Sequence, residues 1–157
     1  MNLTHAADRS EAVPGDTVIF TAWVTNNSKI HLRNIRLIPR SFTNEAMETL
    51  AYSSQPGAAA LCLDSLAPGE SVMRSFSYVV KPSDHAHGGT LVSAMQVTAF
   101  FLGRQVMHEH DAVVSLTGAP HAWPVRRTPR SRGYKSSRGH IKGPGRRLKR
   151  LLKAAGR

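Results

Sequence analysis

The chain has 157 residues, with 21 Lys or Arg against 10 Asp or Glu and a single cysteine. This length fits one domain with an appendage, and the single cysteine excludes an intramolecular disulfide and a multi-cysteine zinc site. Apolar runs stay well short of the roughly 18 residues that span a bilayer, and residues 1–15 lack the pattern of a secretory signal. We therefore expect a cytoplasmic protein.

The positive charge is concentrated at the C-terminal end. Residues 119–157 hold 13 of the 21 bases and no acid, whereas residues 1–118 hold 8 bases and 10 acids. The chain therefore divides into a body with a net charge of −2 and a basic tail with a net charge of +13, and the overall pI describes neither part.

Short apolar runs with a period of two make up the body, separated by clusters of Pro, Gly, Asn and Ser. Residues 17–27 form the clearest strand pattern, with one face built from Val18, Phe20, Ala22 and Val24. Residues 33–40 direct Ile35 and Leu37 inward, and we expect this strand to end at Pro39, which cannot donate a ladder hydrogen bond.

The later runs of the body alternate in the same way. Residues 70–82 place Arg74 on the same face as four apolar side chains, Val72, Phe76, Tyr78 and Val80. Residues 89–103 and 110–118 each present one apolar face, formed by Leu91, Met95, Val97 and Ala99 in the first run and by Ala112, Val114 and Leu116 in the second. Residues 44–50 are either a single helical turn or a loop. Strands at this spacing predict an all-β sandwich.

Two turns share the sequence Pro-Gly followed by an acidic residue, and each one opens a strand. The first is Pro14-Gly15-Asp16, and the second ends the segment Leu66-Ala67-Pro68-Gly69-Glu70. With the alternating runs after them, they make residues 13–117 resemble the bacterial conserved-repeat domain of unknown function. The resemblance implies an immunoglobulin-like β-sandwich and no catalytic residues, and it suggests a cell-surface setting. We place a sandwich of about seven strands at residues 10–118, after a short N-terminal extension, residues 1–9.

Two outward-facing apolar residues, Ile19 and Trp23, lie on the opposite face of residues 17–27 from the expected core. We expect this face to be partly buried by a sandwich strand that crosses over it, or to be covered by a neighbouring loop, the tail or another protomer. The alternative is an exposed contact surface for a protein. Cys62, within an apolar run, is expected to be a small buried side chain.

Histidines occur in two pairs, in the segments Asp84-His85-Ala86-His87 and His108-Glu109-His110-Asp111, and such side chains suit zinc or copper. A hairpin closed at residues 103–104 would place His108 opposite Ala99, about 40 Å from His87 at roughly 3.3 Å per residue. We therefore expect no shared metal site and no cofactor. Nucleophile-elbow, P-loop and dinucleotide-binding motifs are absent from the sequence, so we expect no catalytic residues and no enzyme.

The tail has two parts. Residues 118–145 are rich in Pro, Gly, Ser and Arg and bury too little apolar surface to fold alone, so we expect disorder. Residues 146–155 place apolar side chains at helical spacing, at Leu148, Leu151, Leu152 and Ala155, opposite a basic face. A helix this short is marginal in water, so we expect it to form only on a partner.

The tail predicts a polyanion as partner, most directly nucleic acid or a ribonucleoprotein. The predicted polyanion-binding residues are Arg126, Arg127, Arg130, Arg132, Lys135, Arg138, Lys142, Arg146, Arg147, Lys149, Arg150 and Lys153. Trp123 and Tyr134 are candidates for stacking on unpaired bases. An anionic membrane or wall polymer, or no specific partner, are the alternatives. The sequence thus favours a non-catalytic binding or scaffolding module, with self-assembly through the sandwich; the alternative is a structural surface or particle-coat module.

Overall fold

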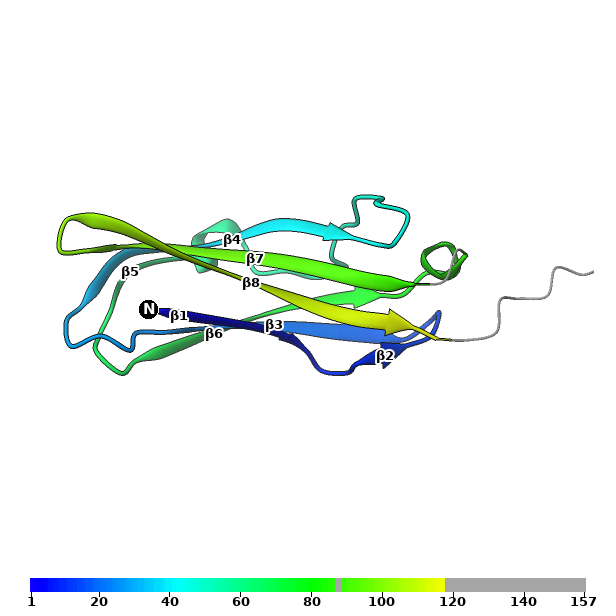
Figure 1. Cartoon of the computed structure of the whole chain (residues 1–157), viewed down its shortest axis with the longest axis horizontal. Helices are drawn as coiled ribbons and strands as arrows, with labels where there is room; N and C mark the ends of the chain where they lie inside the picture. The colour runs from blue at the N-terminus through cyan, green and yellow to red at the C-terminus, as the bar shows by residue number, and fades with distance from the viewer. Residues whose placement is uncertain (87–88, 118–157) are drawn as a thin grey trace, which may run out of the picture. The chain divides into compact units, whose positions relative to one another are not determined.

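The computed structural model describes residues 1–86 and 89–117, which form two β-sheets packed face to face (Figure 1). The strands are β1 (Asn2–Ala7), β2 (Glu11–Ala12), β3 (Thr17–Thr25), β4 (Leu32–Thr43), β5 (Cys62–Leu66), β6 (Ser71–Val79), β7 (Thr90–Phe101) and β8 (Arg104–Leu116). Two short 3₁₀ helices, η1 (Ala58–Leu61) and η2 (Pro82–His85), interrupt them. Neither is long and apolar enough to cross a membrane. The predicted immunoglobulin-like sandwich is confirmed.

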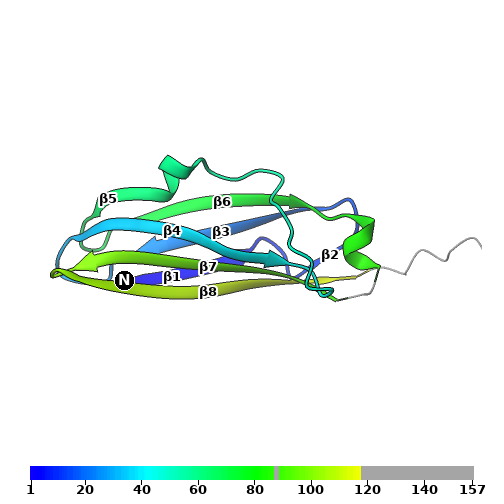
Figure 2. The same ribbon diagram turned by 90° about the horizontal axis from the view of Figure 1, so that it is seen from above.

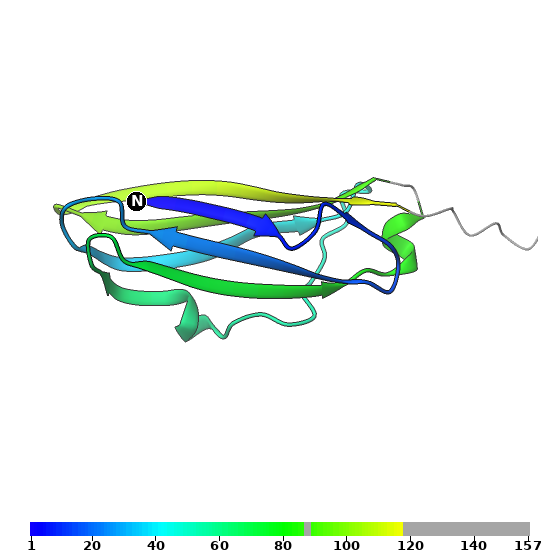
Figure 3. The ribbon, with the colours of Figure 1, turned by 90° about the horizontal axis from the view of Figure 1, so that it is seen from below.

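One sheet has the strand order β1-β3-β6 and the other has the order β2-β8-β7-β4-β5. Neighbouring strands are antiparallel except β2, which runs parallel to β8. The chain therefore changes sheets between β1 and β2, and Figure 3 shows β1, β3 and β6 side by side. Residues 1–86 and 89–117 contain eight strands, where the sequence predicted about seven.

The N-terminal residues belong to the sandwich, so the expected extension over residues 1–9 is wrong. β1 pairs with β3 along its whole length, and the side chains of Leu3 and His5 are each 1% exposed. The alternation is present here, but a histidine occupies one of its inward positions and polar residues follow it. A short run with a polar group at a core position carries too weak a hydrophobic signal to stand out.

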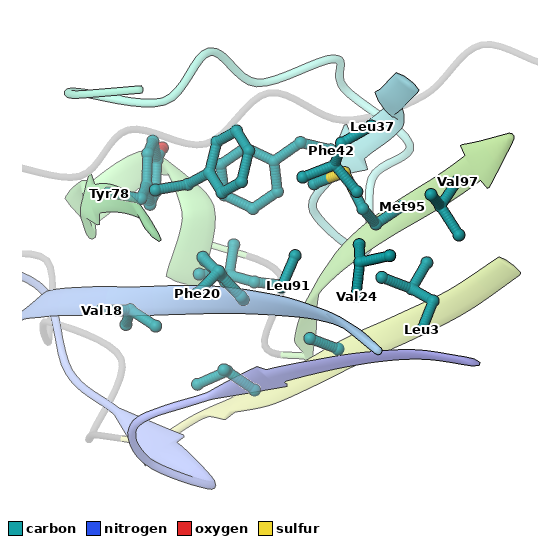
Figure 4. Packing of buried hydrophobic residues seen from close by; sticks show 14 of the residues in the cluster. Leu3, Val18, Phe20, Val24, Leu37, Phe42, Tyr78, Leu91, Met95 and Val97 are labelled. Atoms are coloured by element: carbon teal, nitrogen blue, oxygen red, sulfur yellow. The ribbon is translucent and has the colours of Figure 1, made fainter. Parts of the chain in front are cut away.

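The core lies between the sheets and contains the side chains that alternation predicted, apart from the half-buried Val72 (Figure 4). An aromatic cluster occupies one part of it. The rings of Phe42 and Tyr52 stack with centroids 4.6 Å apart, and Phe20 meets Phe42 edge-on at 5.4 Å. Offset and edge-to-face arrangements of this kind are the favoured geometries for aromatic pairs.

The two Pro-Gly turns are closed by the same type of hydrogen bond, from a backbone N–H group to an acidic side chain. In the first, Val13 N–H donates to the Asp16 carboxylate at 3.1 Å; in the second, Ala67 N–H donates to the Glu70 carboxylate at 2.8 Å. The glycine in each turn has a positive φ, 98° at residue 15 and 75° at residue 69, a backbone region that glycine adopts without strain. The acidic third residue of each triplet therefore closes the turn that opens the next strand.

Strand β4 passes through Pro39 and ends at Thr43, so the prediction that it ends at the proline is wrong. The pairing of β4 with β7 shifts register between Pro39 and Ser41, which marks a β-bulge. A proline lacks an N–H group, and a bulge is one of the few places in a sheet where this is tolerated. Residues 44–50 form a turn, closed by a bridge between Thr43 and Thr49.

Arg74 lies on the inner side of β6, as predicted, but its guanidinium reaches the edge of the sheet. It donates to the carbonyl oxygen of Ala60 at 2.6 Å and to that of Met73 at 2.8 Å. Further along the same edge, Ser77 exchanges backbone hydrogen bonds with residues 53–54. These contacts cover part of an edge strand that would otherwise be open to pairing with another chain.

Cys62 is exposed, so the expectation that it is buried is wrong. It begins β5, which pairs only with β4 and forms the edge of the larger sheet. A residue on a short edge strand has no neighbouring strand on one side, so an apolar local sequence does not ensure burial there.

Candidate functional site

The predicted polyanion-binding residues lie outside the residues that the structure describes, and so do Trp123 and Tyr134. The predicted helix over residues 146–155 lies outside them too. These remain predictions from charge and spacing. The described part of the chain offers two other features, an apolar surface and a buried polar cluster.

The apolar surface lies on the outer side of the three-stranded sheet. Ile19 and Trp23 of β3 are 42% and 38% exposed, and Met73 and Val79 of β6 are 54% and 43% exposed. Trp23 lies directly opposite Met73 in the β3–β6 pair. We call these four residues the β3–β6 apolar face. Of the two alternatives for Ile19 and Trp23, the exposed surface is the one seen within the described residues.

Met73 and Val79 were not singled out from the sequence, although the signal was present. Alternation in residues 70–82 placed them on the face opposite Phe76 and Tyr78, which are each 1% exposed. Pairing β6 with β3 is what brings them beside Trp23 and Ile19, and only the strand order shows this. The same register places Thr21 and Ser75 between the Trp23–Met73 pair and the other two residues, so the face carries apolar side chains at both of its ends. Exposed apolar side chains gathered on one face are candidates for protein contacts.

Within residues 1–86 and 89–117, no group of three or more His, Cys, Asp or Glu side chains is close enough together to hold a metal ion. His85 is buried, at 9% exposure, and His87 falls outside the described residues. The predicted hairpin at residues 103–104 is present, but His108 lies opposite Val97 instead of Ala99. The nitrogen Nδ1 of His110 accepts a hydrogen bond from the backbone N–H of His5 at 3.2 Å, which links β8 to β1.

A buried polar cluster joins three segments that are distant in sequence. His5 Nε2 of β1 lies 2.6 Å from Ser93 Oγ of β7, and the Tyr52 hydroxyl lies 2.6 Å from the same oxygen. His5 also stacks on Phe20, with ring centroids 6.0 Å apart. His5 Nδ1 is buried without a hydrogen-bond partner in the described structure. Sequence reasoning missed this cluster because β1 was not recognised as a strand.

Burial governs the chemistry of this cluster. Desolvation lowers the pKa of His5 to about 4, so the imidazole is neutral near pH 7. The same cause raises the pKa of Tyr52. A serine beside a histidine is a pairing found in hydrolases, but Ser93 is 0% exposed and His5 is 1% exposed. A substrate has no access to either side chain, so the cluster contributes to packing and specificity of the core.

No family model matches the chain, and no curated protein matches it either. Among solved structures, the chain is similar to PapD-like domain 7 of human CEP192 with 10% identity and a TM-score of 0.42, covering 74% of this chain and 86% of that one. It is similar to the fimbrial subunit MyfA of Yersinia enterocolitica with 11% identity and a TM-score of 0.45, covering 75% and 100%. It is similar to the sporulation control protein Spo0M of Bacillus subtilis with 17% identity and a TM-score of 0.38, covering 75% and 49%. Membership of the conserved-repeat family remains a prediction.

Proposed function

We propose that the chain is a non-catalytic binding module whose basic tail anchors it to nucleic acid or a ribonucleoprotein. The observation that carries this proposal is the charge partition, 13 bases without an acid in residues 119–157 beside a body with a net charge of −2. Such a tail repels itself and requires counterions or a polyanion. The tail binds the nucleic acid or ribonucleoprotein and thereby holds the sandwich on it.

The physical basis of the anchoring is counterion release. Each Lys or Arg that contacts a phosphate releases condensed cations, so log affinity falls with log salt at about −0.9 per contact on duplex DNA and about −0.7 on single strands. The body contributes little to the salt-dependent part of the affinity, because its few bases are balanced by acids. Affinity is therefore expected to depend steeply on salt and to vanish with the tail.

A gel shift with a single-stranded RNA and a duplex DNA, each at two salt concentrations, tests the anchor. The full chain is compared with residues 1–118, which contain the complete sandwich and its core. We expect binding by the full chain only, weakened strongly by salt. Retained binding by residues 1–118, or binding that salt leaves unchanged, would exclude the tail as anchor.

A charge-reduced variant refines the test without removing residues. Replacing the terminal cluster by glutamine, at Arg146, Arg147, Lys149, Arg150 and Lys153, is expected to reduce the salt slope by about 3.5 on single strands and about 4.5 on duplex DNA. The matched control replaces three exposed arginines of β4, Arg33, Arg36 and Arg40, and is expected to leave the slope unchanged. Phospholipid and nucleic acid both present phosphate, so a separate assay must distinguish them. Flotation with anionic and neutral liposomes shows whether the chain binds phospholipid.

A second role, contact with another copy of the chain, is favoured by the β3–β6 apolar face. Four exposed apolar side chains lie on one face of two adjacent strands, and Trp and Met are enriched at protein interfaces. Contact between copies through this face is how a coat or scaffold module would assemble.

Sedimentation of the wild type is expected to show a dimer or larger species, and Trp23→Ser is expected to give a monomer. Val113→Ser, on the outer side of the other sheet, is the control. A wild type that stays monomeric at about 100 μM would refute self-assembly through this face.

A further inference from the structure

The outer side of the five-stranded sheet carries a depression of about 640 Å³, lined by residues of β4, β5, β7 and β8. The arrangement of these four strands can be followed in Figure 2. We call it the outer groove and define it by Asn34, Arg36, Asp64, Gln96, Phe100 and Gln105. Its volume lies within the range of about 300–1,000 Å³ that is usual for small-ligand sites. It faces away from the core and from the β3–β6 apolar face.

A β-bulge shapes the outer groove. Arg33 of β4 pairs with Phe100 of β7, and Arg36 pairs with Thr98, so two intervening residues of β4 oppose one of β7. Asn34, one of these two, has a φ of 50°, a left-handed conformation that asparagine tolerates better than most residues. Bulges bend a strand and redirect its side chains. Here the bulge places both Asn34 and Arg36 along the groove.

The polar side chains of the outer groove retain hydrogen-bonding capacity. Within residues 1–86 and 89–117, the side chains of Asn34, Arg36, Asp64 and Gln105 have no hydrogen bond or ion pair to other protein groups. Gln96 differs, because its amide nitrogen donates to the carboxylate of Glu109. One groove residue is therefore held in place by the protein, and four are free to contact a ligand.

The chemistry of this lining selects the class of ligand. One guanidinium and one carboxylate balance in charge, so the groove does not favour a polyanion or a polycation. An apolar ligand would cover both charges without pairing them, which is costly. Amide side chains offer a donor and an acceptor in one plane, as neighbouring hydroxyl groups require. Phe100, 44% exposed, adds an aromatic surface for apolar C–H groups.

We propose that the outer groove binds a neutral oligosaccharide. Vicinal hydroxyl pairs contact Arg36 and Asp64 through paired hydrogen bonds, and the C–H face of a sugar ring packs on Phe100. Asn34 and Gln105 contact further hydroxyls. The groove is built wholly from residues 34–105, so this binding does not depend on the basic tail and is expected to be insensitive to salt.

Cys62 allows the proposal to be tested on the full chain. It is the only cysteine of the protein, it is exposed, and it lines the outer groove. The probes are neutral hexasaccharides of β-1,4-glucose, α-1,4-glucose, β-1,4-mannose and β-1,4-xylose. We expect at least one of them to slow the reaction of Cys62 with Ellman's reagent, and to give a saturable titration calorimetry signal that high salt leaves unchanged.

Two variants with matched controls assign the binding to the groove. Arg36→Ala is expected to weaken it about tenfold or more, because hydrogen bonds to a charged group are lost, and Phe100→Ala is expected to weaken it severalfold. Arg33→Ala, an exposed arginine of β4 outside the groove lining, and Val113→Ala, on the same sheet face, are expected to bind as the wild type does.

Three outcomes would overturn the proposal. The first is the absence of binding by every hexasaccharide up to about 10 mM. The second is binding that both controls weaken as much as the groove variants do. The third is protection of Cys62 by an uncharged extended peptide and by none of the saccharides, which would assign the groove to a peptide. Salt-sensitive RNA binding by the tail is a separate observable, so loss of one property does not imply loss of the other.

Discussion

His5 makes the stability of the sandwich depend on pH. Its side chain is 1% exposed, stacks on Phe20 and bonds to Ser93, which in turn bonds to Tyr52. Burial lowers its pKa from 6.5 to about 4, with a smaller contribution in the same direction from His110. Folding therefore requires a neutral imidazole, and acid is expected to oppose folding through this one group.

The size of the effect follows from the difference in pKa between the two states. The unfolded chain takes up a proton at His5 below about pH 6.5, whereas the folded chain does so only below about pH 4. Between these values the unfolded state binds more protons, so the free energy of unfolding falls as the pH falls. At 1.36 kcal/mol per pKa unit, the total loss is about 3 kcal/mol, complete near pH 4.

Urea unfolding of the wild type and of His5→Leu, followed by circular dichroism at several pH values from 7.5 to 4, isolates this contribution. Other titrating groups are common to both proteins, so the difference between their curves reports His5. We expect the wild type to lose about 3 kcal/mol more than the variant over this range. Parallel curves would show that His5 is not desolvated as the structure places it, and the reasoning would fail.

Other buried polar contacts and the edge strand give further tests. Asn26 is 0% exposed and donates to two backbone carbonyl oxygens at 2.9 Å, so Asn26→Asp is expected to lose about 2 to 4 kcal/mol in urea unfolding. The neighbouring exposed Asn27→Asp is expected to change stability by less than about 0.5 kcal/mol, and an equal loss in both would contradict the buried role. Tyr78→Phe removes a donor at 2.6 Å from the buried Asp84 carboxylate, with an expected loss of about 1 to 3 kcal/mol in the same assay. Cys62 is expected to react with Ellman's reagent without denaturant; reaction only after unfolding would contradict its exposure.

The sequence alone was sufficient for the fold class and for most of the core. Side chains in a strand alternate between its faces, so a run such as residues 17–25 shows directly which residues face the interior. The buried apolar positions of β3, β7 and β8 were predicted in this way, whereas the buried polar residues Ser93 and Gln96 of β7 were not. The same rule placed Ile19 and Trp23 outside, and the structure shows both exposed. The division into a neutral body and a basic tail is likewise a property of composition.

Tertiary structure alone decided which segments meet. Alternation is a local property, whereas strand order, register and bulges arise from packing between residues far apart in the chain. The exposure of Cys62 follows from the edge position of β5, and the outer groove follows from a bulge in β4. The cluster of His5, Ser93 and Tyr52 joins three distant segments, and its polar members carry no hydrophobic signal in the sequence. Local pattern therefore determined which faces are buried, and long-range pairing determined what each face contacts.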